Sequence, residues 1–229
     1  MKKISISQSN YIPWKGYFDL INMADEFIFH DDLQYTKNDW RNRNKIKTKN
    51  GLEWLTIPCG VNEKRLICEV ELENKDWQKH HWQKIVANYS KASYFNAYKD
   101  FFEDFYLNKK WTNLSEMNQT LIKRISKEIL SINTEFYDSR DFNLKSKKSE
   151  RVKELLVKRN ADIYYSGPSA KDYLEEKELE DAGIKVVWMD YSGYLEYIQL
   201  FPPFEHNVSI LDLIFNEGKN ARHFLKSFP

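Results

Sequence analysis

"KISISQSNYIPWKGYFDLINMADEFIFHDD", residues 3 to 32, decides the fold of this 229-residue chain. Apolar and small polar residues alternate from Lys3 to Gln8, which is typical of a β-strand with one buried face. Pro13 suits an early helical position, and apolar residues follow it at helical spacing: Trp14, Tyr17, Phe18 and Ile21. A second strand, Glu26 to His30, ends at two carboxylates, Asp31 and Asp32. The stretch therefore predicts a strand–helix–strand unit and with it a parallel sheet.

Helix and strand patterns alternate again in the last third of the chain. They predict a strand near Glu135 to Tyr137, a helix around Glu150 to Arg159, a strand at Asp162 to Ser166, a helix over Ala170 to Asp181 and a strand at Val186. Between about 76 and 132 the apolar spacing is helical throughout and predicts three helices. The expected fold class is α/β: a mainly parallel sheet with flanking helices, an inserted helical subregion and a β-hairpin, in a single domain over residues 1–229.

Composition narrows the classes of partner and compartment. Lys and Arg total 35 against 34 Asp and Glu, so the formal charge of +1 gives no field that would draw the molecule to nucleic acid, and any anion site must be local. Two cysteines, Cys59 and Cys68, argue against a disulfide framework and lack zinc-ligand spacing. The N-terminus has no apolar signal core and no stretch is long enough for a membrane span, so we expect a cytoplasmic protein.

The predicted hairpin carries basic residues at every second position. Arg41 and Arg43 flank Asn42 and follow Trp40, a combination of guanidinium donors, an amide and a flat ring that suits a phosphate or diphosphate beside a planar or sugar moiety. Asn50-Gly51 is a two-residue turn signal. For the lysines that follow, we favour a structural interpretation, in which they protect a solvent-facing edge strand from aggregation: Lys45, Lys47 and Lys49.

Two polar loops follow predicted strands, where open α/β sheets bind ligands. The first contains Gln8, Asn10 and Tyr11 and leads to Trp14. The second contains a glycine, two hydroxyls and a cation: Ser166, Gly167, Ser169 and Lys171. Its serines have a structural alternative, the capping of the next helix. Two such loops in one chain favour a nucleotide or nucleotide-sugar pocket, and Gln34 is included among the substrate-binding candidates.

The candidate acid–base residues are His30, Asp31, Asp32 and His81. Adjacent residues of an extended chain point in opposite directions, so we expect only one of Asp31 and Asp32 to face a site, and a simple turn pair is the alternative. His81 lies on the apolar stripe of a predicted helix, which suits a packed, hydrogen-bonded histidine as well as a general base. No set of metal ligands is predicted.

Several blocks of the sequence, in order along nearly the whole chain, resemble the WbqC family, which occurs with genes for bacterial surface polysaccharide. They are "SQSNYIPWKGYFDLINMADEFIFHDDLQYTKNDWRNRNKI" from Ser7, "WLTIPC" from Trp54, "HWQKIVANYSKASYF" from His81, "DIYYSGPSAKDYL" from Asp162 and "SILDLIFNEG" from Ser209. Family members tend to have His-Gln-Pro where this chain has Ser7, Gln8 and Ser9. If that histidine is catalytic in relatives, this chain lacks it there.

The resemblance implies a role in O-antigen or other lipopolysaccharide biosynthesis. We expect an enzyme acting on a dTDP- or UDP-linked amino sugar, a transferase or amide-forming ligase that moves an acyl or aminoacyl group to the sugar amine, with ATP as a candidate cofactor. Cations from Arg41, Arg43 and Lys171 would meet phosphate charge. Two alternatives stay open: a glycosyltransferase with a divalent metal at the Asp31–Asp32 pair, and a non-catalytic glycan-binding or assembly protein.

Overall fold

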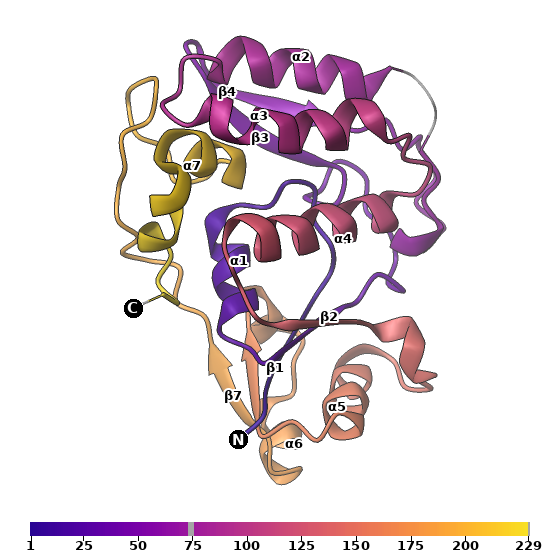
Figure 1. The fold of residues 1–229 in the computed structure, drawn as a ribbon. Helices are drawn as coiled ribbons and strands as arrows, with labels where there is room; N and C mark the ends of the chain where they lie inside the picture. The colour runs from indigo at the N-terminus through magenta and orange to yellow at the C-terminus, as the bar shows by residue number, and fades with distance from the viewer. Residues whose placement is uncertain (73–75, 229) are drawn as a thin grey trace.

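The computed structural model describes residues 1–72 and 76–228, and it contains a five-stranded parallel sheet, which lies below α1 and α4 in the view of Figure 1. The strands are β1 (Lys3–Ser7), β2 (Glu26–Phe29), β5 (Glu135–Asp138), β6 (Ile163–Ser166) and β7 (Lys185–Trp188). Their order is β5-β2-β1-β6-β7. The chain moves outward from β1 to β2 through helix α1 (Lys15–Asn22), then returns to pair β6 with the other edge of β1. The strand order therefore reverses between β1 and β6.

The two faces of the sheet are buried against different helices because side chains of a strand alternate between faces. Ile28 packs on one side, in the cluster that contains apolar residues of α5 (Lys148–Lys158) and α6 (Glu176–Asp181). Phe27 and Phe29 pack on the other side, in the cluster that contains α1 and α4 (Leu114–Arg124). Figure 1 shows α4 and α5 on opposite sides of the sheet. The strand–helix–strand unit and the α/β fold class predicted from the sequence are confirmed.

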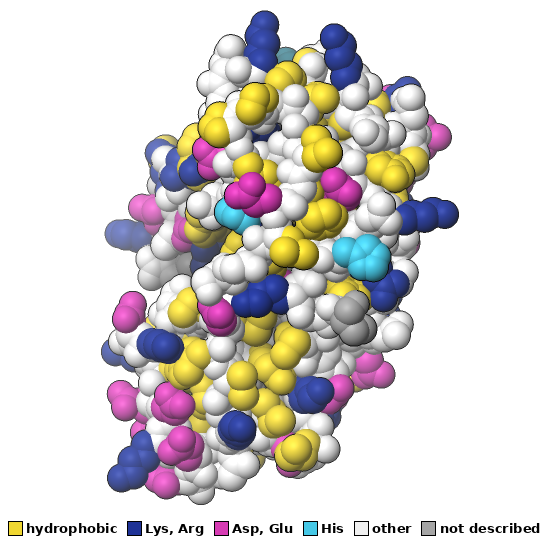
Figure 2. Space-filling model, turned by 90° about the vertical axis from the view of Figure 1, so that its left-hand side faces the viewer, with side chains coloured by type: hydrophobic (Ala, Val, Ile, Leu, Met, Phe, Trp, Pro, Cys, Tyr) yellow, Lys and Arg dark blue, Asp and Glu magenta, His cyan; other side chains and the backbone are white. Residues whose placement is uncertain are grey.

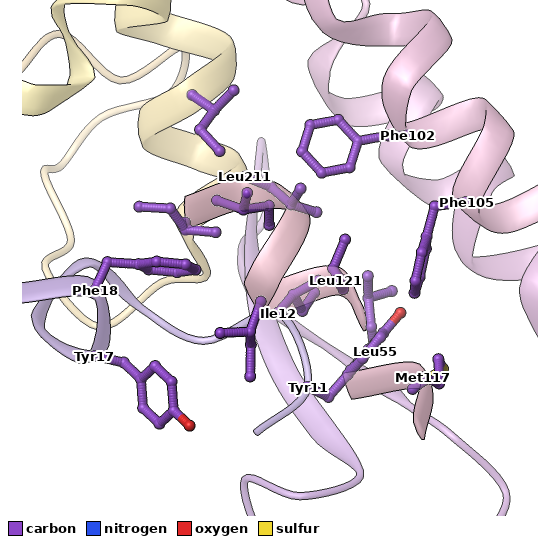
Figure 3. Packing of buried hydrophobic residues seen from close by; sticks show 14 of the residues in the cluster. Tyr11, Ile12, Tyr17, Phe18, Leu55, Phe102, Phe105, Met117, Leu121 and Leu211 are labelled. Atoms are coloured by element: carbon purple, nitrogen blue, oxygen red, sulfur yellow. The ribbon is translucent and has the colours of Figure 1, made fainter. Parts of the chain in front are cut away.

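The helical subregion covers a two-stranded hairpin. It consists of α2 (Trp77–Tyr89), α3 (Phe95–Glu103) and α4. A π-helical segment, Asp104–Asn108, continues α3, and another, Ile125–Ile129, continues α4. The hairpin consists of β3 (Arg43–Thr48) and β4 (Gly51–Thr56). Helix α7 (Ile210–Glu217) closes the same core, in which Leu55, Leu121 and Leu211 gather around Ile12 (Figure 3). The remaining helical segments are the 3-10 helices Ile67–Glu69, Ser139–Phe142, Pro168–Asp172 and Gly218–Phe224.

Three local predictions were wrong. The helix expected over Ala170 to Asp181 is split into the 3-10 helix Pro168–Asp172 and α6, because the backbone leaves the helical region at Glu175 (φ −81°, ψ 86°), whose N–H donates to Ser149. The hairpin turn is centred on Lys49 and Asn50, one residue earlier than expected, with Gly51 at φ 100° opposite Thr48.

The third wrong prediction concerns Lys47, which was expected on a solvent-facing edge and is only 2% exposed. Its backbone N–H donates to the Tyr89 hydroxyl at 2.9 Å, and its ammonium donates to the carbonyl of Pro203. The segment around Pro203 therefore covers this part of the hairpin.

The surface carries both signs of charge side by side. On the face drawn in Figure 2, basic and acidic side chains are interspersed. None of the helices within residues 1–72 and 76–228 has the length and apolar character needed to cross a membrane.

Candidate functional site

A cavity of about 420 Å³ opens at the carboxyl ends of β1 and β6, at the point where the strand order reverses. Open α/β sheets bind their ligands at this position, because the loops diverge there and leave a crevice. The wall residues come from the end of β1 and the loop after it, from α1, from the end of β6 and the segment after it, from the segments after β2 and β7, and from the first turns of α5. They include Ser7, Gln8, Asn10, Trp14, Tyr17, His30, Lys148, Tyr164, Ser166, Gly167, Ser169, Tyr173 and Tyr191.

The loop after β1 connects the cavity with Arg41. Arg41 donates from Nη2 to Oε1 of Gln8 at 2.9 Å and forms an ion pair with Asp39 at 2.9 Å. Burial raises the pKa of Tyr173, a wall residue, and the charge of Arg41 partly offsets that rise. The guanidinium group therefore lies close enough to act electrostatically on the cavity, and its Nε has no hydrogen-bond partner among the described residues.

The loop after β6 forms the opposite wall. The Ser166 hydroxyl is buried and donates to the hydroxyl of Tyr164 at 3.3 Å. Gly167 has φ −67° and ψ 150°, which any residue adopts, and a Cβ there would lie 3.7 Å from the Tyr191 hydroxyl. The Tyr191 hydroxyl therefore lies beside Gly167 in the cavity wall. Lys171 lies outside the wall, with its ammonium 5.3 Å from the ring centre of Trp188.

His30, Asp32 and Arg151 form a charged cluster beside the cavity. Arg151 donates from Nε to His30 Nε2 at 3.2 Å and from Nη2 to Asp32, and Ser139 donates to Asp32 at 2.5 Å. His30 is 5% exposed, and this burial lowers its pKa, with Asp32 opposing the change and Arg151 adding to it. A guanidinium only donates, so Nε2 of His30 is the acceptor and the neutral ring carries its proton on Nδ1.

Asp31 points away from this cluster and into the core. Its carboxylate is fully buried and accepts three hydrogen bonds, from the Ser9 backbone at 2.7 Å, the Ser115 hydroxyl at 2.5 Å and the Gln119 amide at 3.0 Å. It ties the loop after β1 to α4. Within residues 1–72 and 76–228, no group of three His, Cys, Asp or Glu side chains is arranged to hold a metal ion.

Five further candidates from the sequence lie outside the cavity wall. The Tyr11 hydroxyl is in the core, 2.8 Å from Nδ1 of His81 and 2.6 Å from the Tyr106 hydroxyl. Burial lowers the pKa of His81 to about 4. Asn42 is buried and donates to the Ile57 carbonyl, Gln34 is exposed, and the Arg43 guanidinium stacks on Trp54.

Sequence reasoning missed the contribution of α5. The chain from β5 to β6 crosses over through α5, and a crossover helix runs antiparallel to the strands, so it begins at their carboxyl ends. This topology brings Lys148 into the cavity wall and Arg151 against His30. The sequence contains a signal for this contribution, because it predicts a helix around Glu150 directly before the strand "DIYYS". The four tyrosines of the wall, Tyr17, Tyr164, Tyr173 and Tyr191, have no sequence signal that separates them from core residues.

Comparisons with known proteins identify relatives without assigning a reaction. The model of the WbqC-like protein family matches residues 8–224. The chain is 46% identical over 228 residues to "Uncharacterized protein Rv1507c" of Mycobacterium tuberculosis (strain ATCC 25618 / H37Rv), a match that covers 99% of this chain and 98% of that protein. No solved structure matches. The family match includes both loops and the His30 cluster, and the chain belongs to the WbqC-like protein family.

Proposed function

We propose that this protein is an enzyme of bacterial surface polysaccharide biosynthesis that binds a dTDP- or UDP-linked amino sugar in the cavity and transfers an acyl or aminoacyl group to the sugar amine. The observation that carries the proposal is the meeting of Gln8 with its partner Arg41, Ser166 and His30 around one cavity at the reversal of strand order. The hydroxyls and amides of the wall suit a sugar, and Lys148 of the wall and Arg41, which contacts Gln8, add positive charge near it.

In the proposed reaction the amine nitrogen bonds to the carbonyl carbon of an activated acyl donor, such as an adenylate or a thioester. The bond between that carbon and the leaving group breaks, and the amine loses a proton. His30 is the proton acceptor in this scheme, because its lowered pKa keeps the ring neutral near pH 7. The Asp32 carboxylate, 3.6 Å from Nε2, stabilises the imidazolium that forms.

Arg151 controls the availability of His30 in this scheme. Its Nε–H occupies the lone pair of His30 Nε2, so the histidine becomes a base only when that contact is released. A negatively charged group of the substrate or of the acyl donor that attracts the Arg151 guanidinium would break this contact. The proposal therefore couples the binding of the charged substrate to the activation of His30.

Binding and transfer are tested separately. Thermal-shift assays with UDP-linked amino sugars should show stabilisation, about 2.7 kcal/mol at a ligand concentration one hundred times Kd. Mass spectrometry of the sugar incubated with ATP and amino or organic acids should show the mass of one added acyl group. His30→Gln should slow this transfer by about 10²- to 10⁴-fold and leave binding intact. His80→Gln is the control, because His80 is an exposed histidine of α2 outside the cavity wall.

Two outcomes would overturn the proposal. Release of the nucleotide with formation of a glycosidic product would assign glycosyl transfer instead. Retention of glycans without turnover of any acyl donor would assign a binding protein.

A further inference from the structure

Two further hollows share wall residues with the cavity or with each other and are lined by tryptophans. A hollow of about 180 Å³ shares Asn10 and Trp14 with the cavity. A third hollow of about 250 Å³ shares Trp40 with the second and ends at Trp54 on the hairpin. We call these two outer hollows the tryptophan groove.

The indole rings of the groove are exposed side by side. Trp40 is 44% exposed and Trp54 is 37% exposed, and their ring centres are 5.5 Å apart with a tilt of 39°. Large aromatic side chains are usually buried in a core, so two adjacent exposed ones mark a surface that contacts something else. Flat rings at this spacing suit a planar or ring-shaped ligand.

The groove also has a local positive charge. The Arg43 guanidinium lies 4.2 Å and the Lys45 ammonium 4.9 Å from the ring centre of Trp54. Within residues 1–72 and 76–228, no carboxylate forms an ion pair with the Arg43 guanidinium or the Lys45 ammonium. The acidic residue in the groove wall, Asp39, pairs with Arg41. These cations are therefore available to an anion.

Two buried polar atoms in the groove have no hydrogen-bond partner among the described residues: Oδ1 of Asn10 and Nε of Arg43. Asn10 lies at the junction with the cavity, and Arg43 lies at the outer end. A buried polar group without a partner is costly, so each of these two wall residues has an unmet hydrogen-bonding requirement.

We propose that the tryptophan groove binds the nucleoside diphosphate part of the substrate, with the base stacked on Trp40 and Trp54 and the diphosphate against Arg43 and Lys45. The position of the sugar beyond the junction, in the cavity, rests on the proposed function. A nucleotide is favoured over a neutral glycan because two cations without carboxylate partners match phosphate charge, which a neutral glycan lacks.

The test is isothermal titration calorimetry with UDP and with dTDP, neither of which carries a sugar. Trp40→Ala and Trp54→Ala should each weaken binding by about 5- to 150-fold, the range for loss of one aromatic stacking partner. Arg43→Gln should also weaken it and should reduce its dependence on salt. Leu52→Ala and Lys49→Gln are matched controls, since both residues are exposed on the same hairpin and neither lines the groove.

Trp40→Ala alone keeps the test valid if the hairpin variants fail to fold, because Trp40 precedes β3 and lies outside both strands. The inference is overturned if UDP and dTDP bind the tryptophan variants as tightly as the unaltered protein. It is also overturned if the neutral oligosaccharide chitotriose, and not UDP, binds in a manner that depends on these tryptophans.

The two proposals fail in distinguishable ways. UDP binding that depends on the tryptophans, combined with no acylated product, supports the groove and refutes the proposed reaction. Acyl transfer that the tryptophan variants carry out with unchanged KM for the UDP-linked sugar supports the reaction and refutes the groove.

Discussion

Protonation of His81 should destabilise the fold as the pH falls below about 6.5. The imidazole is 6% exposed, and its Nδ1 lies 2.8 Å from the Tyr11 hydroxyl, which in turn contacts Tyr106. Burial is the largest cause of its lowered pKa, and a hydrogen bond to the Thr56 carbonyl opposes the change. The unfolded chain therefore takes up the proton at higher pH than the native protein does.

The size of the effect follows from the two pKa values. A histidine in an unfolded chain has a pKa near 6.5, and His81 has a pKa of about 4 in the native protein. At about 1.4 kcal/mol per unit, the contribution amounts to about 3 kcal/mol. It is fully present above pH 6.5, is lost as the pH falls from 6.5 to about 4, and has fallen by about 2 kcal/mol at pH 5.

Urea unfolding at pH 7.5, 6 and 5 measures this loss, with His81→Gln as the reference. Glutamine can accept from Tyr11 and donate to Thr56 but does not titrate. The pKa of His30 is also lowered, but both proteins share that contribution, so the difference between their pH profiles isolates His81. Parallel profiles for the two proteins would refute the assignment of His81 as a buried neutral residue.

Three further substitutions test other buried contacts. Asp31→Asn should lower the free energy of unfolding by about 2–3 kcal/mol, because an amide places a donor opposite the Gln119 amide; an unchanged Tm would contradict the structural role of Asp31. Gly218→Ala should lower the free energy of unfolding by about 2 kcal/mol or more, because φ is 56° and the new Cβ would lie 2.3 Å from the Tyr94 ring. In a Tyr94→Ala background, chemical denaturation should show a smaller loss, because the steric clash is gone and the backbone strain remains. Lys47→Met should cost about 1–3 kcal/mol in urea by leaving the Pro203 carbonyl without its donor, whereas Lys49→Met, at the exposed turn, should leave stability unchanged.

The first half of the sheet could be predicted because its signals are local. A period of two in β1 and the helical spacing of α1 are both visible within 30 consecutive residues, from Lys3 to Asp32. The burial of Lys47 could not be predicted, because the Pro203 carbonyl that accepts a hydrogen bond from its ammonium is 156 residues away in the sequence. The alternation of the hairpin predicts which residues share a face and does not predict which segment covers that face.

The same limit applies to the candidate site. Gln8, His30 and Ser166 could be proposed because a strand end is a local feature and parallel strands share one edge. No feature of the sequence separates Tyr11 from the tyrosines of the cavity wall. Its hydroxyl contacts His81 only because α2 packs against the loop after β1. Asp31 and Asp32 separated as the geometry of extended chains predicts, yet which of them would turn inward depended on Ser115 and Gln119 of α4.

The central place of β1 has a consequence for protein synthesis. One edge of β1 pairs with β2 early in the chain, but the other edge waits for Ile163 to Tyr165. A nascent polypeptide that has been synthesised only as far as β5 has unpaired backbone donors and acceptors along one edge of β1. Unpaired strand edges of this kind associate with other chains. Products that end before β6 should therefore require chaperones or be degraded, and they also lack the cavity wall residues from Tyr164 to Tyr191.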